Sequence, residues 1–236
     1  MANSKDPIGA AILDFSKNKT GDNITVHSDL CDDDILPTAY LFRTYNEMPE
    51  VEQKALDLCQ GEVLEVGAGT GCHAKYLMQN NFKTFSIDTS NGSVDYMKSQ
   101  NIPCQNISFL EYHNAHFDTV LILMNGLGIA GKLKNISAFL AHAKSLLNEN
   151  GIILADSSDI RYLYDDNDGG KWVDLNSDYL GEMEFQMEYK QHKSDWFPWV
   201  YIDFETLKNE AKKVGLKATK LIENENFHYL TKLEII

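Results

Sequence analysis

The feature that most constrains this chain is a short apolar strand pattern that runs directly into a turn with three glycines. The segment is Val63-Leu-Glu-Val-Gly-Ala-Gly-Thr-Gly71, and a helical pattern begins at Cys72. Glycines let a backbone approach a ligand closely, and a helix N-terminus presents N–H groups that the helix itself does not use. In an open α/β sheet such a turn lies at the carboxyl end of a strand, where ligands bind. The segment therefore predicts a βαβ unit that binds a nucleotide-like ligand.

The rest of the chain repeats this alternation of strand and helix. Pro49–Gln60 has the apolar face of a helix, which Gly61 ends, and Ser90 and Asp203 are candidate N-caps of helices that run to about residues 99 and 214. Such alternation is typical of a parallel sheet that is buried on both faces. We expect further helices at 72–80 and 133–147, and strands at 62–66, 83–87, 103–108, 117–124, 151–156, 217–223 and 227–234.

Two regions do not follow the pattern. Residues 1–36 are polar and irregular apart from a short helical pattern at 8–15, and we expect residues 1–48 to form an N-terminal extension or cap. Residues 157–202 are rich in Asp, Tyr and Trp. Their two partly alternating runs, Tyr179–Tyr189 and Trp196–Ile202, predict a β-hairpin inserted as a lid. We therefore expect one ligand-binding domain over 49–236, with the lid at about 157–202.

The composition limits the kinds of partner and the cellular compartment that we expect for this protein. The formal net charge is −14, from 21 basic and 35 acidic residues, which disfavours binding to phosphate backbones and leaves a small molecule as the expected partner. The four cysteines are scattered without a CxxC pair, so we expect reduced thiols and no metal. No apolar run is long enough to span a membrane and no secretory pattern is present, so we expect a cytoplasmic monomer or homodimer.

The spacing of the glycines separates three nucleotide-type motifs. A P-loop would need a Lys-Ser/Thr pair, and a dinucleotide fingerprint would need a glycine where Cys72 stands. The GxGxG spacing, with Glu65 two residues before Gly67, resembles motif I of the class I S-adenosylmethionine-dependent methyltransferases. Ile87-Asp-Thr-Ser90 resembles motif II of that family. The runs 116–128 and 147–159 resemble its fourth and fifth strands, so that the resemblance covers about residues 50–156 and 203–236.

The resemblance implies an α/β fold with a seven-stranded, mostly parallel, doubly wound sheet whose last strand is antiparallel, and S-adenosylmethionine as cofactor. Asp88 would then accept both ribose hydroxyls, and Arg43 could pair with the methionine carboxylate. The family often has an aspartate near the adenine where Ser108 and Phe109 stand here, so we expect a backbone N–H near Phe109 to serve instead. The expected cofactor-binding residues are Arg43, Glu65, Gly67, Ala68, Gly69, Gly71, Asp88, Thr89, Phe109 and Asn125.

The methyl acceptor should bind between the carboxyl edge of the sheet and the lid. We expect Tyr40, Trp196 and Trp199 to contact it. Asp156 and Asp159 are candidate bases, although carboxylates after a strand also cap loops and helices. The sequence thus predicts a methyltransferase acting on a small molecule. A non-catalytic protein that binds S-adenosylmethionine for regulation, or a nicotinamide-dependent oxidoreductase, are the alternatives.

Overall fold

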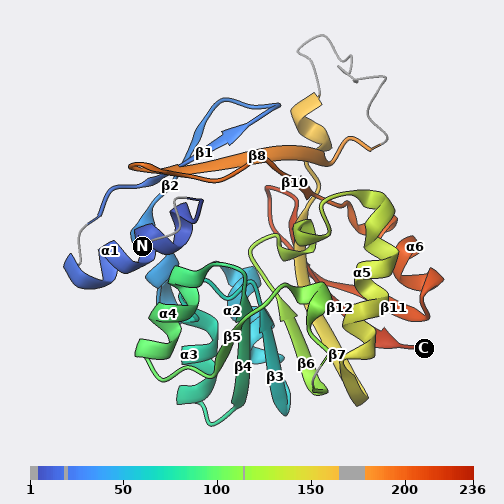
Figure 1. Ribbon diagram of the computed structural model, residues 1–236. Helices are drawn as coiled ribbons and strands as arrows, with labels where there is room; N and C mark the ends of the chain where they lie inside the picture. The colour runs from blue at the N-terminus through green and yellow to red at the C-terminus, as the bar shows by residue number, and fades with distance from the viewer. Residues whose placement is uncertain (1–4, 19–20, 114, 165–178) are drawn as a thin grey trace.

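A computed structural model of the 236-residue chain describes residues 5–18, 21–113, 115–164 and 179–236. Its larger sheet has the strand order β11-β12-β7-β6-β3-β4-β5 (Figure 1). β12 runs antiparallel to both β7 and β11, whereas the other neighbours are parallel. This topology confirms the predicted doubly wound sheet. The strands are β3 (Glu62–Val66), β4 (Lys83–Asp88), β5 (Cys104–Asn106), β6 (Phe117–Ile122), β7 (Leu147–Ser158), β11 (Leu216–Glu223) and β12 (His228–Ile235).

Helices cover both faces of this sheet, and successive residues of β3 show why. Val63 packs with Leu56 and Leu77 on one face, while Leu64 packs with Phe139 and the residues of the opposite helices on the other. Because both side chains are fully buried, β3 needs apolar residues facing both layers of helices at Val63 and Leu64, which is the pattern that the sequence shows there. The helices are α2 (Glu50–Asp57), α3 (Cys72–Gln79), α4 (Asn91–Ser99), α5 (Leu133–Ser145) and α6 (Phe204–Lys213).

The helix boundaries follow local capping chemistry. The Ser90 hydroxyl accepts a hydrogen bond from the Ser93 N–H at the start of α4. The Asp203 carboxylate accepts one from the Thr206 N–H at the start of α6. Both N-caps were predicted from the sequence, and both are confirmed. None of the described helices is long and apolar enough to cross a membrane.

A second sheet lies over the carboxyl edge of the first (Figure 1). Its order is β10-β8-β1-β2, with β9 paired to β8, and we call it the lid sheet. Phe185 pairs with Phe197 across the hairpin predicted in the insertion, of which residues 165–178 lie outside the described residues. The strands are β1 (Ile24–Ser28), β2 (Asp34–Leu36), β8 (Glu182–Tyr189), β9 (His192–Lys193) and β10 (Phe197–Val200).

The N-terminal extension supplies two of these strands, which the sequence did not indicate. β1 pairs with β8, with Val26 opposite Met187, and β2 forms the outer edge. β1 is short and is flanked by acidic residues, so its β-branched residues alone do not predict a strand. They form one because β8 pairs with them. The lid is therefore built jointly from both ends of the sequence.

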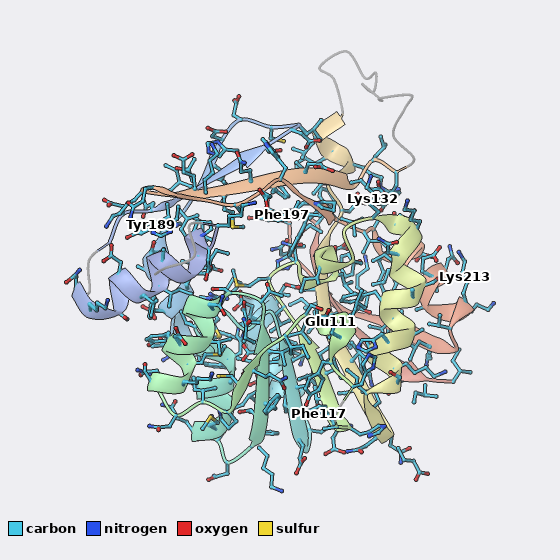
Figure 2. The ribbon with its side chains drawn as sticks, in the orientation of Figure 1. Glu111, Phe117, Lys132, Tyr189, Phe197 and Lys213 are labelled. Atoms are coloured by element: carbon cyan, nitrogen blue, oxygen red, sulfur yellow. The ribbon has the colours of Figure 1, made fainter. Side chains whose placement is uncertain are left out.

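Helix α1 (Pro7–Asn18) connects the lid sheet to the larger sheet. Its Gly9 packs so closely on Gly92 of α4 that a Cβ at Gly92 would lie 2.5 Å from the Gly9 backbone. The hydroxyl of Tyr189, at the end of β8, donates to the Asp14 carboxylate at 2.9 Å. Figure 2 shows Tyr189 beside α1 and Phe197 under the lid sheet. This helix thus holds one end of the lid on the α4 side of the molecule.

Candidate active site

A cavity of about 690 Å³ lies between the glycine turn and the lid sheet. Its size is within the range of roughly 300–1,000 Å³ that is typical of pockets for small ligands. One part of its wall is the carboxyl edge of β3, β4 and β6, and the opposite part comes from α1, β2, β8 and β10. The cavity therefore lies where a ligand is expected in an open α/β sheet, and the lid sheet covers it.

The glycine turn after β3 opens into this cavity. Gly67, Gly69 and Gly71 have φ angles of 69°, 57° and 69°, a region that other residues rarely adopt. A Cβ at Gly69 would meet no atom within 4 Å, whereas one at Gly71 would lie 2.9 Å from the Ile102 side chain. Gly69 therefore leaves room for a ligand, while Gly71 allows close packing of the turn on its own neighbours.

Asp88 stands at the end of β4, beside this turn. One carboxylate oxygen accepts the Gly69 N–H at 2.7 Å and the other accepts the Ser90 N–H at 2.7 Å. Burial raises the pKa of Asp88 to about 6, against the lowering effect of these two N–H groups. Each carboxylate oxygen has a further lone pair, so Asp88 can accept two more hydrogen bonds from a ligand such as a ribose.

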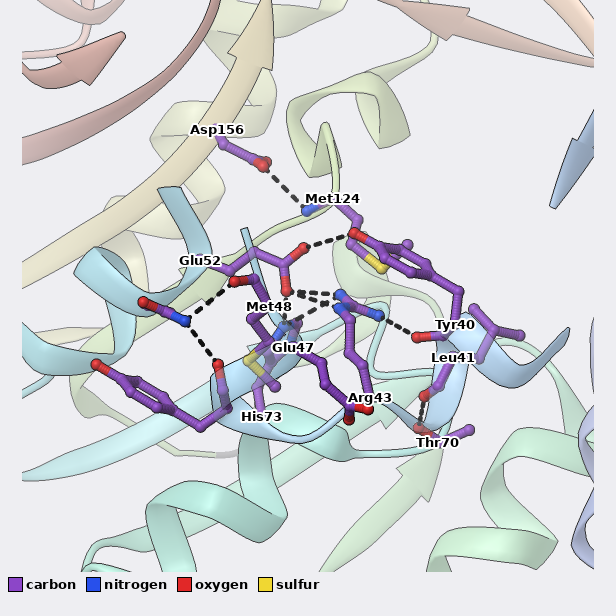
Figure 3. Close-up of polar contacts among 12 residues, drawn as sticks. Tyr40, Leu41, Arg43, Glu47, Met48, Glu52, Thr70, His73, Met124 and Asp156 are labelled. Atoms are coloured by element: carbon purple, nitrogen blue, oxygen red, sulfur yellow. Dashed lines mark hydrogen bonds and ion pairs between the residues drawn. The ribbon is translucent and has the colours of Figure 1, made fainter. Parts of the chain in front are cut away.

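Four charged side chains form a buried network on the other side of the glycine turn, and Figure 3 labels three of them, Arg43, Glu52 and His73. Arg43 donates from Nε and Nη2 to Glu52 of α2, at 3.0 and 2.6 Å. His73 of α3 lies 2.8 Å from the same Glu52 oxygen and 3.0 Å from Glu65 of β3. We call Arg43, Glu52, Glu65 and His73 the charge network. Arg43, Glu65 and His73 line the cavity.

The network also fixes its own charge states. Burial opposes a charge on His73, but contacts with Cys72, Glu52 and Glu65 raise the pKa of His73 well above its ordinary value. Burial alone would raise the pKa of Glu52, but the bonds from His73 and the charge of Arg43 lower it. The cations of Arg43 and His73 and the anion of Glu52 are thus held together in the interior next to the cavity.

The loop after β6 forms another wall, and Asp156 of β7 holds it in place. Met124 and Asn125 have φ angles of 65° and 55°, which is strained for residues with side chains. The buried Asp156 carboxylate accepts the N–H groups of Met124 and Gly126 at 3.1 and 3.2 Å, and it pairs with His228 at 2.8 Å. This carboxylate, which does not line the cavity, positions the loop.

The lid contributes an apolar wall. Phe197, Pro198 and Trp199 of β10 line the cavity, together with Leu36 and Met187. Trp199 packs on the loop after β6, so closely that a Cβ at Gly128 would lie 2.0 Å from the indole nitrogen. Among the described residues of the lid sheet that line the cavity, none carries an ionisable side chain.

The structure brings most of the predicted cofactor residues to one cavity. Arg43, Glu65, Gly67, Ala68, Gly69, Asp88, Thr89 and Phe109 line it, as does Trp199 of the predicted acceptor residues. Tyr40 instead stacks over the Arg43 guanidinium, and Asp159 pairs with Arg161. The other predicted residues outside the lining are Gly71, Asn125, Trp196 and Asp156.

Sequence reasoning missed several residues of the wall. His73 follows the glycine turn directly, but the sequence holds no signal that pairs it with Glu52. Lys5 and Asp6 come from the part of the extension that looked irregular, and Ile8 comes from the short helical pattern at 8–15, which gave no sign of lining a site.

Comparison with known proteins agrees with this geometry. A family model described as a methyltransferase domain matches residues 63–151. A methyltransferase from Bacteroides fragilis, solved with S-adenosyl-L-homocysteine, is 41% identical, with a TM-score of 0.92 over 100% of this chain and 97% of that one. A search of curated proteins finds no match.

More distant structures share the fold. The CcbJ methyltransferase of Streptomyces caelestis is 14% identical, with a TM-score of 0.60 over 81% of this chain and 94% of the other. An amino pentose methyltransferase of Micromonospora echinaspora is 10% identical, with a TM-score of 0.55 over 81% and 94%.

Fold, glycine turn and strand-end acid together define a class I methyltransferase. The 41% identity over the whole chain shows the family: the chain belongs to the S-adenosylmethionine-dependent methyltransferases. The cofactor is S-adenosylmethionine, as predicted, and this finding favours an enzyme over both alternatives weighed from the sequence.

Proposed function

We propose that this methyltransferase acts on a small molecule whose apolar body binds under the lid sheet. The observation that carries the proposal is the division of the cavity into a polar side and an apolar side. The polar side has the glycine turn, Asp88 and the charge network, and the apolar side has the lid wall around Trp199. A cofactor with a polar nucleoside and amino-acid end suits the first, and an apolar acceptor suits the second.

The cofactor residues follow from the sites described above. Asp88 would accept the ribose hydroxyls with its remaining lone pairs, and the open backbone at Gly69 leaves room for the nucleoside. Arg43 and Glu65, on the far side of the turn, carry the charges that complement the carboxylate and the ammonium of the cofactor's amino-acid end. S-adenosylmethionine supplies an activated methyl group when bound, so the protein mainly has to orient the two partners and exclude water.

Two features of the lid favour a small acceptor, namely that it encloses the cavity and that it lines the cavity with aromatic rings. It encloses the cavity with Phe197 and Trp199, whose rings are T-shaped to each other with centroids 6.2 Å apart. Aromatic faces attract apolar molecules and also stabilise a nearby cation such as a sulfonium. In addition, the net charge of −14 opposes the approach of nucleic acids. One structure of similar fold is described as an amino pentose methyltransferase, and this is consistent with the proposal of a small acceptor.

The proposal can be tested with methyl-labelled S-adenosylmethionine. The protein is incubated with a panel of apolar amines, phenols and thiols, and separately with RNA and with unrelated proteins, and transfer of the label is measured. We expect transfer to members of the small-molecule panel. Label that enters only the macromolecules would refute the proposal.

Two tryptophans of the lid provide a matched pair for the same assay. Trp199 lines the cavity, whereas Trp196 is 47% exposed and does not. With any acceptor found, Trp199→Ala should raise the KM for that acceptor about tenfold, because a buried aromatic contact is lost. Trp196→Ala should leave it within about twofold. The affinity for S-adenosylhomocysteine should stay constant in both variants.

A further inference from the structure

The charge network contains a histidine whose two ring nitrogens both face carboxylates. Nε2 of His73 lies 2.8 Å from a Glu52 oxygen, and Nδ1 lies 3.0 Å from a Glu65 oxygen. A carboxylate accepts hydrogen bonds, so this geometry suits a ring that donates from both nitrogens, and these contacts raise the pKa of His73 well above its ordinary value. His73 is therefore an imidazolium that bridges two carboxylates from different elements, α2 and β3.

Arg43 completes the network with a second cation. It shares Glu52 with His73, and a further bond runs from its Nη1 to the Tyr40 carbonyl at 2.9 Å. The side chains of Arg43, Glu52 and His73 are only 2%, 3% and 6% exposed. The bonds to Glu52 and to the Tyr40 carbonyl use three of the five N–H donors of the guanidinium, and Nη2 also lies 3.5 Å from Nε2 of His73, so a donor on Nη1 remains on a residue that lines the cavity.

A buried network of charged groups contributes little net free energy to the stability of a fold. Removing four charged groups from water is costly, and well-packed apolar residues often stabilise an interior equally well. A buried network does fix the relative positions of its members, since each loses its partner if it moves. Glu65 is further held by the Ser86 hydroxyl at 2.9 Å. The network thus sets the distance between one cation and one anion at the cavity wall.

We propose that His73 is a positioning residue, which holds Glu65 directly, and Arg43 through Glu52, to receive the amino-acid end of the cofactor. That end carries one carboxylate and one ammonium, so it requires one fixed cation and one fixed anion. The proposal rests on the proposed function, because it takes the cofactor to bind with its ribose at Asp88 and its amino-acid end across the glycine turn. His73 contacts Glu52 and Glu65, and in this proposal it does not contact the sulfur or the methyl group of the cofactor.

A truncated ligand separates positioning from general support of the fold. S-adenosylhomocysteine carries the amino-acid end, whereas 5′-methylthioadenosine has the same nucleoside and sulfur without it. Titration calorimetry of both ligands with the wild type and with His73→Gln measures each affinity. We expect His73→Gln to weaken S-adenosylhomocysteine about tenfold or more, since charge-assisted contacts are misplaced. The affinity for 5′-methylthioadenosine should change less than about twofold.

Two other variants keep the test decisive if His73→Gln fails to fold. Glu52→Gln retains the size of the side chain and removes the shared anion, and it should produce the same selective loss. His116→Gln changes an exposed histidine outside the cavity and should affect neither ligand. Equal weakening of both ligands by the network variants, or no weakening of either, overturns the proposal. If instead the wild type binds S-adenosylhomocysteine no better than 5′-methylthioadenosine, the assignment of the amino-acid end is itself wrong.

Discussion

The two sheets of this protein are held in different ways. In the larger sheet, β3 is buried at four of its five positions and is packed between helices on both faces. In the lid sheet, β8 is fully buried only at Met183 and Tyr189, and the edge residue Ile35 is 59% exposed. Buried apolar area is the main source of folding free energy, so the larger sheet has much more of it per strand.

This difference matches the division of the cavity. The larger sheet supplies the backbone turn and the carboxylates Glu65 and Asp88 that line the cofactor side of the cavity. The lid sheet supplies side chains only, on strands with few buried contacts. Regions with few buried contacts open at lower free energy than the core. We infer that the cofactor site is formed before any ligand binds, whereas the lid is the part that can open for the acceptor.

The largest effect that we expect on the cofactor side of the cavity comes from removal of the Asp88 carboxylate. Asp88→Ala should weaken S-adenosylhomocysteine at least about a hundredfold, because two hydrogen bonds to a charged acceptor are lost. Titration calorimetry measures the effect, and 5′-methylthioadenosine should be weakened to the same degree, since it has the same ribose. Asp95→Ala, at an exposed position on α4, is the control. An unchanged affinity in Asp88→Ala would move the cofactor away from β4.

The contact between the lid and the larger sheet can be strained at one atom. In Gly128→Ala the new Cβ would lie 2.0 Å from the Trp199 indole nitrogen, and this glycine does not have a positive φ. The expected cost is overpacking, of about 1–3 kcal/mol in the free energy of unfolding measured by urea titration.

The control for this variant lies elsewhere in the chain. Gly21→Ala should cost less than about 0.5 kcal/mol, because its nearest neighbour would be an ordinary 3.4 Å contact. In a Trp199→Ala background the cost of Gly128→Ala should fall below the same limit. If it does not, the strain has a source other than the lid.

A change of pH tests the cofactor half of the cavity through Asp88. Since burial raises the pKa of Asp88 to about 6, its carboxylate is largely protonated at pH 5, and a protonated group is a poorer acceptor for a ribose. The affinity for S-adenosylhomocysteine should therefore fall about tenfold from pH 7 to pH 5. Asp88→Asn, which cannot titrate, should lose this dependence.

The sign of the stability effect separates this loss from unfolding. The pKa of Asp88 is higher in the folded chain than the usual 3.8, so the folded state binds the proton more tightly. The contribution of this group to stability is present below about pH 3.8 and is lost as the pH rises through about 6. Between these values, acidification weakens the cofactor while this group favours folding. Affinity that rises on acidification would contradict the assignment.

The same contrast explains how far the sequence could predict the molecule. The strand at 62–66, the N-caps Ser90 and Asp203 and the closing antiparallel strand were all predicted, because each depends on local periodicity, capping or a motif. Glu65, Gly69 and Asp88 were found for the same reason, and they line the cavity.

What the sequence missed depends on contacts between distant residues. Strand β1 exists because β8, more than 150 positions later, pairs with it, as in Val26 with Met187. Asp156 and Asn125 were expected at the ends of strands, but Asp156 lies within β7 and Asn125 lies in the loop after β6, and their side chains bond the Met124–Gly126 loop and Ser158. The partnership of His73 with Glu52 likewise requires α2 and α3 to be placed side by side. No local pattern encodes any of these distances.

The smallest expected effect concerns whether the two sheets unfold together. Tyr189→Phe removes the hydroxyl that donates to Asp14, and Tyr229→Phe removes the one that donates to the Ile202 carbonyl at 2.6 Å on the larger sheet. Each should lower the free energy of unfolding by about 1 kcal/mol, the usual net value of one hydrogen bond. The affinity for S-adenosylhomocysteine should change less than about twofold in both variants.

The number of thermal unfolding transitions shows whether the two sheets unfold together. A sheet of so few buried residues, attached through α1, is not expected to be stable by itself, so loss of the larger sheet should take the lid with it. Calorimetry should accordingly show a single unfolding transition in the wild type and in both variants, shifted by a few degrees. A separate transition at lower temperature in Tyr189→Phe alone would show instead that the lid unfolds while the cofactor site stays folded.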